Sequence, residues 1–139
     1  MKKDPGSILL RASGLRATPH RLTLLGTLAT AKTPKTAEEL HARIGSADLV
    51  TIYRNLQSLV SARLVKEVRF KDASMRYELA SEDSHHHHLV CACCGAIEDL
   101  SNCDVRTLEK DVLKDSKRFA SIEEHSLEFF GTCNACAKA

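Results

Sequence analysis

The sequence of 139 residues predicts an α+β protein built from two small domains. Three observations carry this prediction. Apolar residues recur at helical spacing up to about residue 60, strict alternation follows from 64 to 79, and two Cys-x-x-Cys pairs lie in the remainder. A polar stretch that begins at Ser81 separates the alternating segment from the cysteines. We therefore expect domains of residues 1–81 and 82–139.

Three helices are predicted in the first domain. The first begins at Pro19, a residue suited to the first helical position, with Thr18 placed to cap it. The second begins with a capping box over residues 36–39 and ends at Gly45. Asp48 is placed to cap the third, whose buried stripe consists of Leu49, Ile52, Leu56, Leu59 and Val60. The short turn between the last two helices is typical of a helix-turn-helix.

A β-hairpin follows these helices. Residues 64–70 and 75–79 alternate apolar and polar side chains on either side of a short polar loop. Three helices and a hairpin predict a winged helix-turn-helix, in which the third helix enters the DNA major groove and the hairpin lies along the backbone. The second domain is predicted to be a small α/β unit with strands at 89–91, 96–100 and 126–131 and a helix at about 104–117.

Charge is divided unevenly along the chain. Residues 1–80 carry 14 Lys and Arg against 7 Asp and Glu, a balance of +7, whereas residues 81–139 carry 6 against 11, a balance of −5. The basic half indicates a polyanionic partner, which we expect to be double-stranded DNA. Apolar runs are far shorter than the ~20 residues that span a bilayer, and no signal-peptide pattern opens the chain. We therefore expect a cytoplasmic protein that binds no membrane. We also expect that it is not an enzyme and binds no small organic substrate.

The cysteines indicate a metal site. Cys91 and Cys94 form one Cys-x-x-Cys pair, Cys133 and Cys136 form the other, and four thiolates close a tetrahedral zinc shell that leaves no open position for catalysis. Two unrelated pairs of buried thiols are the alternative. A zinc deaminase would need His-x-Glu and Pro-Cys-x-x-Cys motifs, and a thiol redox protein would need a βαβ context; the sequence shows neither. Cys93 is left over as a spectator, an alternative ligand or a redox-labile thiol.

Four consecutive histidines precede the first cysteine pair. In an extended segment His86 and His88 point to one face and His85 and His87 to the other, so each pair can chelate a metal if the fold adds further ligands. The candidates to complete these sites are Glu67, Glu78, Glu98, Asp99, Cys103 and His125. Such mixed shells suit Fe(II), Mn(II) or Zn(II). A solvated histidine run is the alternative.

In combination, these motifs resemble the ferric uptake regulator family over nearly the whole chain. The segments that carry the resemblance are 14–21, 51–56, 77–79, 85–91, 94–95, 125 and 130–136. The resemblance implies a metal-dependent transcriptional repressor that forms a homodimer through a C-terminal α/β dimerisation domain and binds DNA through an N-terminal winged helix. Many members contain a four-cysteine zinc site, and members sense iron, zinc, manganese, nickel or peroxide.

The resemblance also implies roles for individual residues. The structural Zn(II) ligands are Cys91, Cys94, Cys133 and Cys136. The regulatory site at the hinge consists of Glu78, His86, His88 and Asp99, and a second metal site consists of His85, His87 and His125. The DNA-binding residues are Arg16, Arg21, Thr51, Tyr53, Arg54 and Lys71. Tyr53 can touch a thymine methyl, Arg54 a phosphate or base edge, and Arg16 an A·T-rich minor groove.

Two departures from the family pattern bear on metal sensing. The histidine that iron-sensing and peroxide-sensing members supply from the first domain falls near Pro34, and the glutamate of the second site falls at Arg106. Cys103 and Glu67 are the candidates to replace them. We expect a repressor of metal-homeostasis or oxidative-stress genes that acts on A·T-rich pseudo-palindromic operators and carries one regulatory ion, Fe(II), Zn(II) or Mn(II). A constitutive zinc-containing DNA-binding protein is the alternative.

Overall fold

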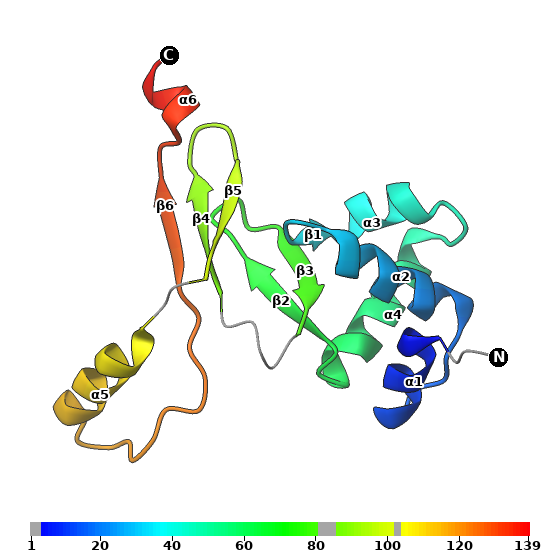
Figure 1. Ribbon diagram of the computed structural model, residues 1–139, viewed down its shortest axis with the longest axis horizontal. Coiled ribbons are helices and arrows are strands. Elements are labelled where there is room, and N and C mark those ends of the chain that lie inside the picture. Colours follow the sequence, from blue (N-terminus) through cyan, green and yellow to red (C-terminus); the bar gives the residue numbers. More distant parts are fainter. Residues whose placement is uncertain (1–3, 81–85, 102–103) are drawn as a thin grey trace. The chain divides into compact units, whose positions relative to one another are not determined.

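The computed structural model describes residues 4–80, 86–101 and 104–139 (Figure 1). The chain divides into two compact units, Met1–Ser81 and Glu82–Ala139, and each contains a three-stranded sheet together with helices. The prediction of an α+β chain is therefore confirmed. Within the described residues, no helix has the length and apolar character needed to cross a membrane.

Four helices open the first unit: α1 (Pro5–Ala12), α2 (Pro19–Thr30), α3 (Ala37–Ile44) and α4 (Leu49–Ser61). Helix α1 was not predicted, because it is eight residues long and buries only Leu10, too little for a periodic pattern. The other three helices begin within one residue of the predicted positions. Their inner faces form one aliphatic core, whose fully buried members include Leu24, Leu40, Ile52, Leu56 and Leu59.

Side-chain caps fix the ends of α3 and α4. The Thr36 hydroxyl accepts the Glu39 backbone N–H at 3.2 Å, and the Glu39 carboxylate accepts the Thr36 N–H at 2.8 Å, which completes the predicted capping box. Gly45 ends α3 with φ 66°, a conformation that glycine adopts without strain. Asp48 caps α4. The predicted cap of α2 is wrong in one respect, because Thr18 holds the N-cap position but its side chain makes no capping hydrogen bond.

The predicted hairpin is formed by β2 (Val65–Arg69) and β3 (Met75–Leu79), which pair antiparallel. A two-residue strand, β1 (Lys35–Thr36), pairs with the other edge of β3 and gives the order β1-β3-β2. This strand was not predicted, because two residues carry no alternation. The buried Tyr77 at the centre of β3 joins the sheet to the helical core.

The second unit is built on a sheet of order β5-β4-β6. Its elements are β4 (His87–Cys91), β5 (Ile97–Leu100), α5 (Val105–Asp115), β6 (Glu128–Gly131) and the short α6 (Asn134–Ala137). The central strand β4 is antiparallel to β5 and parallel to β6. The three strands and α5 agree with the predicted positions to within a few residues, whereas the one-turn α6 was not predicted.

Candidate metal centres and DNA-binding surface

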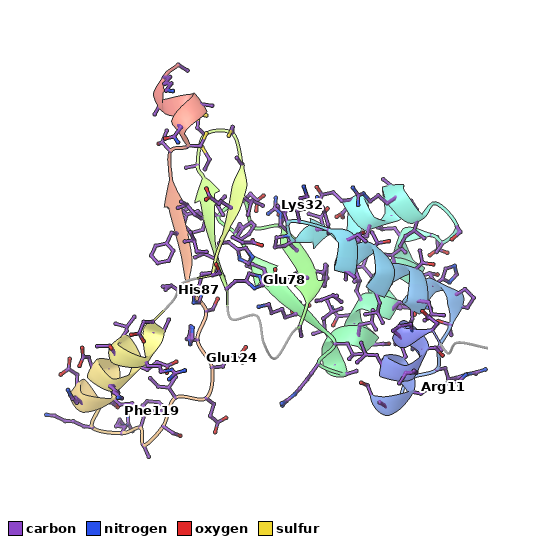
Figure 2. All side chains as sticks on the ribbon, in the orientation of Figure 1. Arg11, Lys32, Glu78, His87, Phe119 and Glu124 are labelled. Carbon is purple, nitrogen blue, oxygen red and sulfur yellow. The ribbon has the colours of Figure 1, made fainter. Side chains whose placement is uncertain are left out.

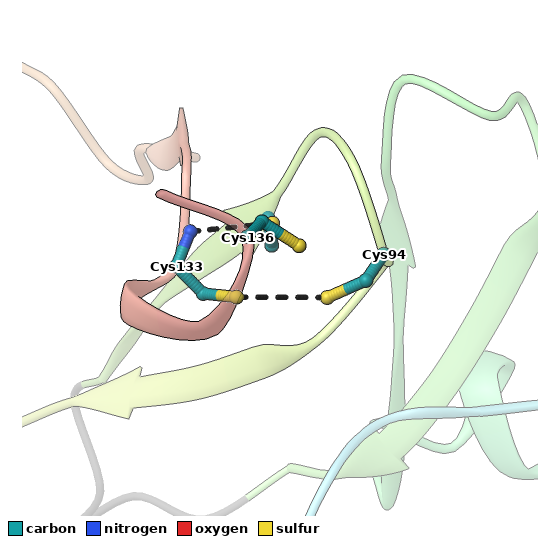
Figure 3. Close-up of side chains that lie close together, drawn as sticks. Cys94, Cys133 and Cys136 are labelled. Atoms are coloured by element: carbon teal, nitrogen blue, oxygen red, sulfur yellow. Dashed lines mark hydrogen bonds between the residues drawn. The ribbon is translucent and has the colours of Figure 1, made fainter. Parts of the chain in front are cut away.

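Four cysteine sulfur atoms converge at one end of the second unit's sheet (Figure 3). Parallel pairing places Cys91 on β4 opposite Gly131 on β6, so that Cys133 follows two residues beyond the paired position. All four sulfur atoms lie within 4.8 Å of one another, and Cys94 Sγ lies 3.7 Å from Cys133 Sγ. Zn–S bonds of about 2.3 Å place tetrahedral sulfur ligands about 3.8 Å apart. The group formed by Cys91, Cys94, Cys133 and Cys136 therefore fits a tetrahedral zinc ion.

Two turns bring each cysteine pair together. After Cys91 the chain reverses at Gly95, which has φ 76° and whose N–H donates to the Cys91 carbonyl at 2.9 Å. In the second pair, Cys133 is the N-cap residue of α6 and Cys136 lies within that helix. The Ala137 N–H donates to the Cys133 carbonyl at 2.9 Å and closes the helical turn.

Backbone N–H groups polarise the sulfur cluster. The Cys133 N–H donates to Cys91 Sγ at 3.3 Å, and together with the N–H groups of Cys94 and Cys93 it lowers the pKa of the Cys91 thiol to about 6. The hydrogen bond with the Cys133 sulfur raises the pKa of Cys136 far above its usual value, because it favours the protonated thiol. A divalent cation displaces the thiol protons and binds the thiolates, so the cluster is suited to hold four thiolates around one ion. Cys93 is exposed.

A second group of ligands involves β4 and β5. His88 and Asp99 are paired in the antiparallel register, and His88 Nε2 lies 3.6 Å from Asp99 Oδ1. The His86 ring lies edge-on to the His88 ring at 5.1 Å between centroids. His88 is buried, at 2% exposure, so an ion bound there would be shielded from solvent. The other predicted hinge ligand, Glu78, lies on β3 of the first unit, where its Oε1 is 3.0 Å from Lys66 Nζ.

A third group of ligands begins at His87 on β4, labelled in Figure 2. His87 Nε2 lies 3.4 Å from His125 Nε2, and Zn–N bonds of 2.0–2.1 Å would place two ligand nitrogens about 3.3 Å apart. His125 Nδ1 in turn lies 2.8 Å from Oε1 of Glu109 on α5. When Nδ1–H donates to this carboxylate, Nε2 is left unprotonated and can bind a metal ion. His85 and Cys103 lie outside the described residues.

Glu109 is a candidate metal-site residue that the sequence motifs did not indicate. The family pattern places the glutamate of the second site at the position of Arg106 in α5, and Arg106 is exposed. Glu109 follows three residues later, which on a helix is the same face one turn further along. That spacing is the signal that could have found it.

Exposed residues of α4 include two of the predicted DNA contacts. Tyr53 and Arg54 are exposed, and the Tyr53 hydroxyl donates to Glu38 Oε1 at 3.0 Å, which raises the pKa of Tyr53. Thr51 is half-buried in the first turn of α4, where its N–H donates to the capping Asp48 carboxylate at 2.7 Å. The three residues thus lie in the first half of one well-capped helix.

The other predicted DNA contacts lie in two loops and in the first turn of α2. Arg16 is exposed and, with Arg11, lines an open pocket of about 640 Å³ between α1 and α2. Arg21 is half-buried, and its Nη1 donates to the Arg16 carbonyl at 3.0 Å, so it braces the loop that carries Arg16. Lys71 is exposed in the turn between β2 and β3.

A basic helical unit with a well-capped exposed helix, joined to a unit with a four-thiolate centre and histidine ligand groups, defines a metal-binding transcriptional regulator. The chain belongs to the ferric uptake regulator family, whose model matches residues 12–130. The peroxide-responsive repressor PerR of Staphylococcus aureus is 29% identical over 131 residues, which cover 91% of this chain and 86% of that protein.

Solved structures show the same relationship. The Vibrio cholerae ferric uptake regulator Fur is 30% identical, with a TM-score of 0.76 over 91% of this chain and 98% of that one. The Campylobacter jejuni peroxide stress regulator is 27% identical, with a TM-score of 0.68 over 96% of this chain and 100% of that one. The resemblance seen in the sequence motifs is confirmed, and the family consists of transcriptional regulators rather than enzymes.

Proposed function

We propose that the protein is a cytoplasmic, homodimeric repressor whose affinity for DNA is set by a divalent metal ion. In this proposal residues 1–81 form a winged-helix DNA-binding domain, and residues 82–139 form a metal-binding dimerisation domain. The targets are A·T-rich pseudo-palindromic operators of metal-homeostasis or oxidative-stress genes. Two half-sites match the two recognition helices of a dimer.

One observation carries the proposal: consecutive histidines of β4 contribute to two different ligand groups. His88 lies beside Asp99, and His87 lies beside His125. Nitrogen and carboxylate ligands of this kind bind Fe(II), Mn(II) or Zn(II) in exchange with the medium, whereas four thiolates hold zinc tightly. The second unit therefore combines a site suited to a permanent structural ion with sites suited to a sensed one.

The regulatory site is proposed to consist of His86, His88 and Asp99, with Glu78 added from the first unit on the strength of the family resemblance. A metal held by ligands from both units would favour the arrangement that matches the operator. The ion acts only by binding the DNA-competent arrangement more strongly than the other arrangements. Its effect on DNA binding therefore equals the difference between its binding free energies for the two states. The second site, which we assign to His87, His125 and Glu109, would stabilise the second unit.

DNA contacts are proposed from helix α4 and the two basic loops. Tyr53, Arg54 and Thr51 would face base edges or phosphates in the major groove, and Arg16 would reach the minor groove. Lys71 at the hairpin turn would contact the phosphate backbone, and Arg21 would act through Arg16. Several such phosphate contacts make binding fall steeply with rising salt.

Exposed apolar side chains support dimerisation through the second unit. Its members with large exposed fractions are Leu89, Leu108, Val112, Phe119 and Phe129. Leu108 and Val112 are each about half exposed and lie one turn apart on α5. A domain of fewer than 60 residues that exposes this much apolar surface gains stability when a second copy covers it.

Fluorescence anisotropy tests the proposed function. The protein is stripped of labile metal while its tightly bound zinc is retained, and it is titrated onto duplex DNA from its own promoter with Zn(II), Mn(II) or anaerobic Fe(II) at buffered activity. We expect one ion to raise the affinity about tenfold or more, which corresponds to about 1.4 kcal/mol of coupling. Affinity that is high and equal with and without every ion would contradict metal sensing.

One observation favours the alternative of a constitutive DNA-binding protein. Pro34, at the position where the family pattern supplies a histidine, is buried and offers no metal ligand. If the alternative holds, the zinc of the four cysteines supports the fold and DNA binding ignores other ions. The anisotropy titration separates the two functions directly.

A further inference from the structure

Helix α4 presents a stripe of four exposed residues at the spacing of one helical face: Val50, Tyr53, Arg54 and Gln57. The opposite face is buried in the core of the first unit. Val50 is 59% exposed and Tyr53 is 38% exposed, so two large apolar groups face outward in the first half of the helix. Val50 lies in the first turn, two residues after the capping Asp48.

Packing within the first unit does not explain why a valine occupies position 50. A β-branched residue is a weak helix former, and at 59% exposure it gains little from burial in the folded chain. The surrounding unit carries 14 Lys and Arg against 7 Asp and Glu, a balance that favours a polyanion as its partner. The N-terminal residues of the second helix of a helix-turn-helix reach base edges in the major groove. There, the apolar group that a side chain can contact is the C5-methyl of thymine.

Hydrogen bonds to neighbouring side chains occupy the polar groups of Tyr53 and Gln57, so Val50 and the Tyr53 ring form an apolar pair. The Tyr53 hydroxyl is already bonded to Glu38 at 3.0 Å, so the ring is fixed and presents its apolar edge and face. At the far end of the stripe, Gln57 Nε2 donates to Glu67 Oε1 of β2 at 3.1 Å. Residues three apart on a helix have Cβ atoms about 5–6 Å apart, a span that reaches neighbouring base pairs stacked about 3.4 Å apart.

We propose that Val50 is a specificity-determining residue, which together with Tyr53 reads the methyl groups of adjacent thymines in the operator. The inference rests on the proposed function of DNA binding and adds the chemistry by which the recognition helix selects bases. It makes methyl contact, rather than hydrogen bonding, the basis of selection at the N-terminal end of α4. Arg54 would add affinity through phosphate or base-edge contacts without reading those methyls.

Deoxyuridine provides the test, because it differs from thymidine only by the missing methyl group. The wild-type protein selects a duplex from a random pool in the presence of Zn(II), Mn(II) or anaerobic Fe(II), each supplied separately. Each thymine of the selected duplex is then replaced in turn by deoxyuridine. We expect one or two replacements to lower wild-type affinity by about fourfold each, the value of one buried methyl. Val50→Ala should bind thymine and deoxyuridine equally at one of these positions. Alanine favours helix at an exposed site, so the variant should fold.

Arg54→Ala is the matched control, since it should weaken binding to both duplexes by the same factor and keep the thymine preference. The proposal is overturned if no single replacement changes wild-type affinity, or if Val50→Ala keeps the wild-type ratio at every position. In both cases the selected duplex still binds, and the proposed function stands. A wild-type protein that selects no duplex with any of the three ions overturns the proposed function itself, and the inference with it.

Discussion

Oε1 of Glu109 lies 2.8 Å from Nδ1 of His125, and this contact joins helix α5 to the segment that leads into β6. It also orients the histidine. With Nδ1 held by the carboxylate, His125 Nε2 faces His87 Nε2 at 3.4 Å, the separation of two nitrogens on one metal ion. The position that the family pattern assigns to a glutamate is filled by Arg106, and Glu109 supplies the carboxylate one turn later.

Glu109→Ala should lower the affinity of this site for Zn(II) or Mn(II) by about 10–100-fold, because removing a carboxylate that orients a ligating histidine has effects of this size. Competition with a fluorescent chelator measures the affinity. Glu124→Ala, in an exposed loop position labelled in Figure 2, is the control and should bind as the wild type does. Equal affinities for all three proteins would show that Glu109 has no part in metal binding.

The sequence predicted the features that depend on local chemistry. The start of a helix with strong caps, such as α3 with Thr36 and Glu39, was predicted to within one residue. The spacing of the cysteine pairs predicted the four-cysteine group that the structure brings together. Contacts that depend on tertiary packing were not predictable. Glu109 reaches His125 across 16 residues, whereas the family pattern expected a glutamate at the position of Arg106. The two-residue β1 exists only because β3 lies beside it.

Cys94→Ser should remove the tightly bound zinc and destabilise the second unit. A four-thiolate shell that loses one ligand binds zinc far more weakly, and the binding energy of a structural zinc is folding energy. Metal analysis of the purified proteins should find about one zinc per chain in the wild type and little in the variant. Cys93→Ser, which changes the exposed neighbouring thiol, should retain zinc. Loss of zinc from Cys93→Ser instead would mean that Cys93 is a ligand.

Thr36→Ala should lower the free energy of unfolding by about 1 kcal/mol, because it removes the hydroxyl that accepts the Glu39 N–H at the start of α3. Urea unfolding followed by circular dichroism measures this difference. Thr36→Ser keeps the hydroxyl and should stay within a few tenths of a kcal/mol of the wild type. If the alanine and serine variants are equally stable, the capping box contributes nothing to stability.

Leu108→Glu combined with Val112→Glu should convert the proposed dimer to a monomer. Both side chains are about half exposed on α5, and two carboxylates buried between subunits would remain unpaired. Sedimentation velocity measures the oligomeric state. The control is Lys110→Glu together with Lys114→Glu, which alters exposed charges of the same helix and should leave the dimer intact. A double variant at Leu108 and Val112 that still sediments as a dimer would place the interface elsewhere.

The central claim is that metal bound by the β4 histidines controls DNA affinity, and His88→Gln tests it most directly. Anisotropy is measured with and without the effective ion for the wild type, His88→Gln and the control Asp115→Asn, whose side chain is exposed at the end of α5. Zinc content and melting temperature confirm that each protein is folded. We predict an affinity gain of about tenfold or more for the wild type and the control, and less than about twofold for His88→Gln. A full gain in His88→Gln would contradict the account.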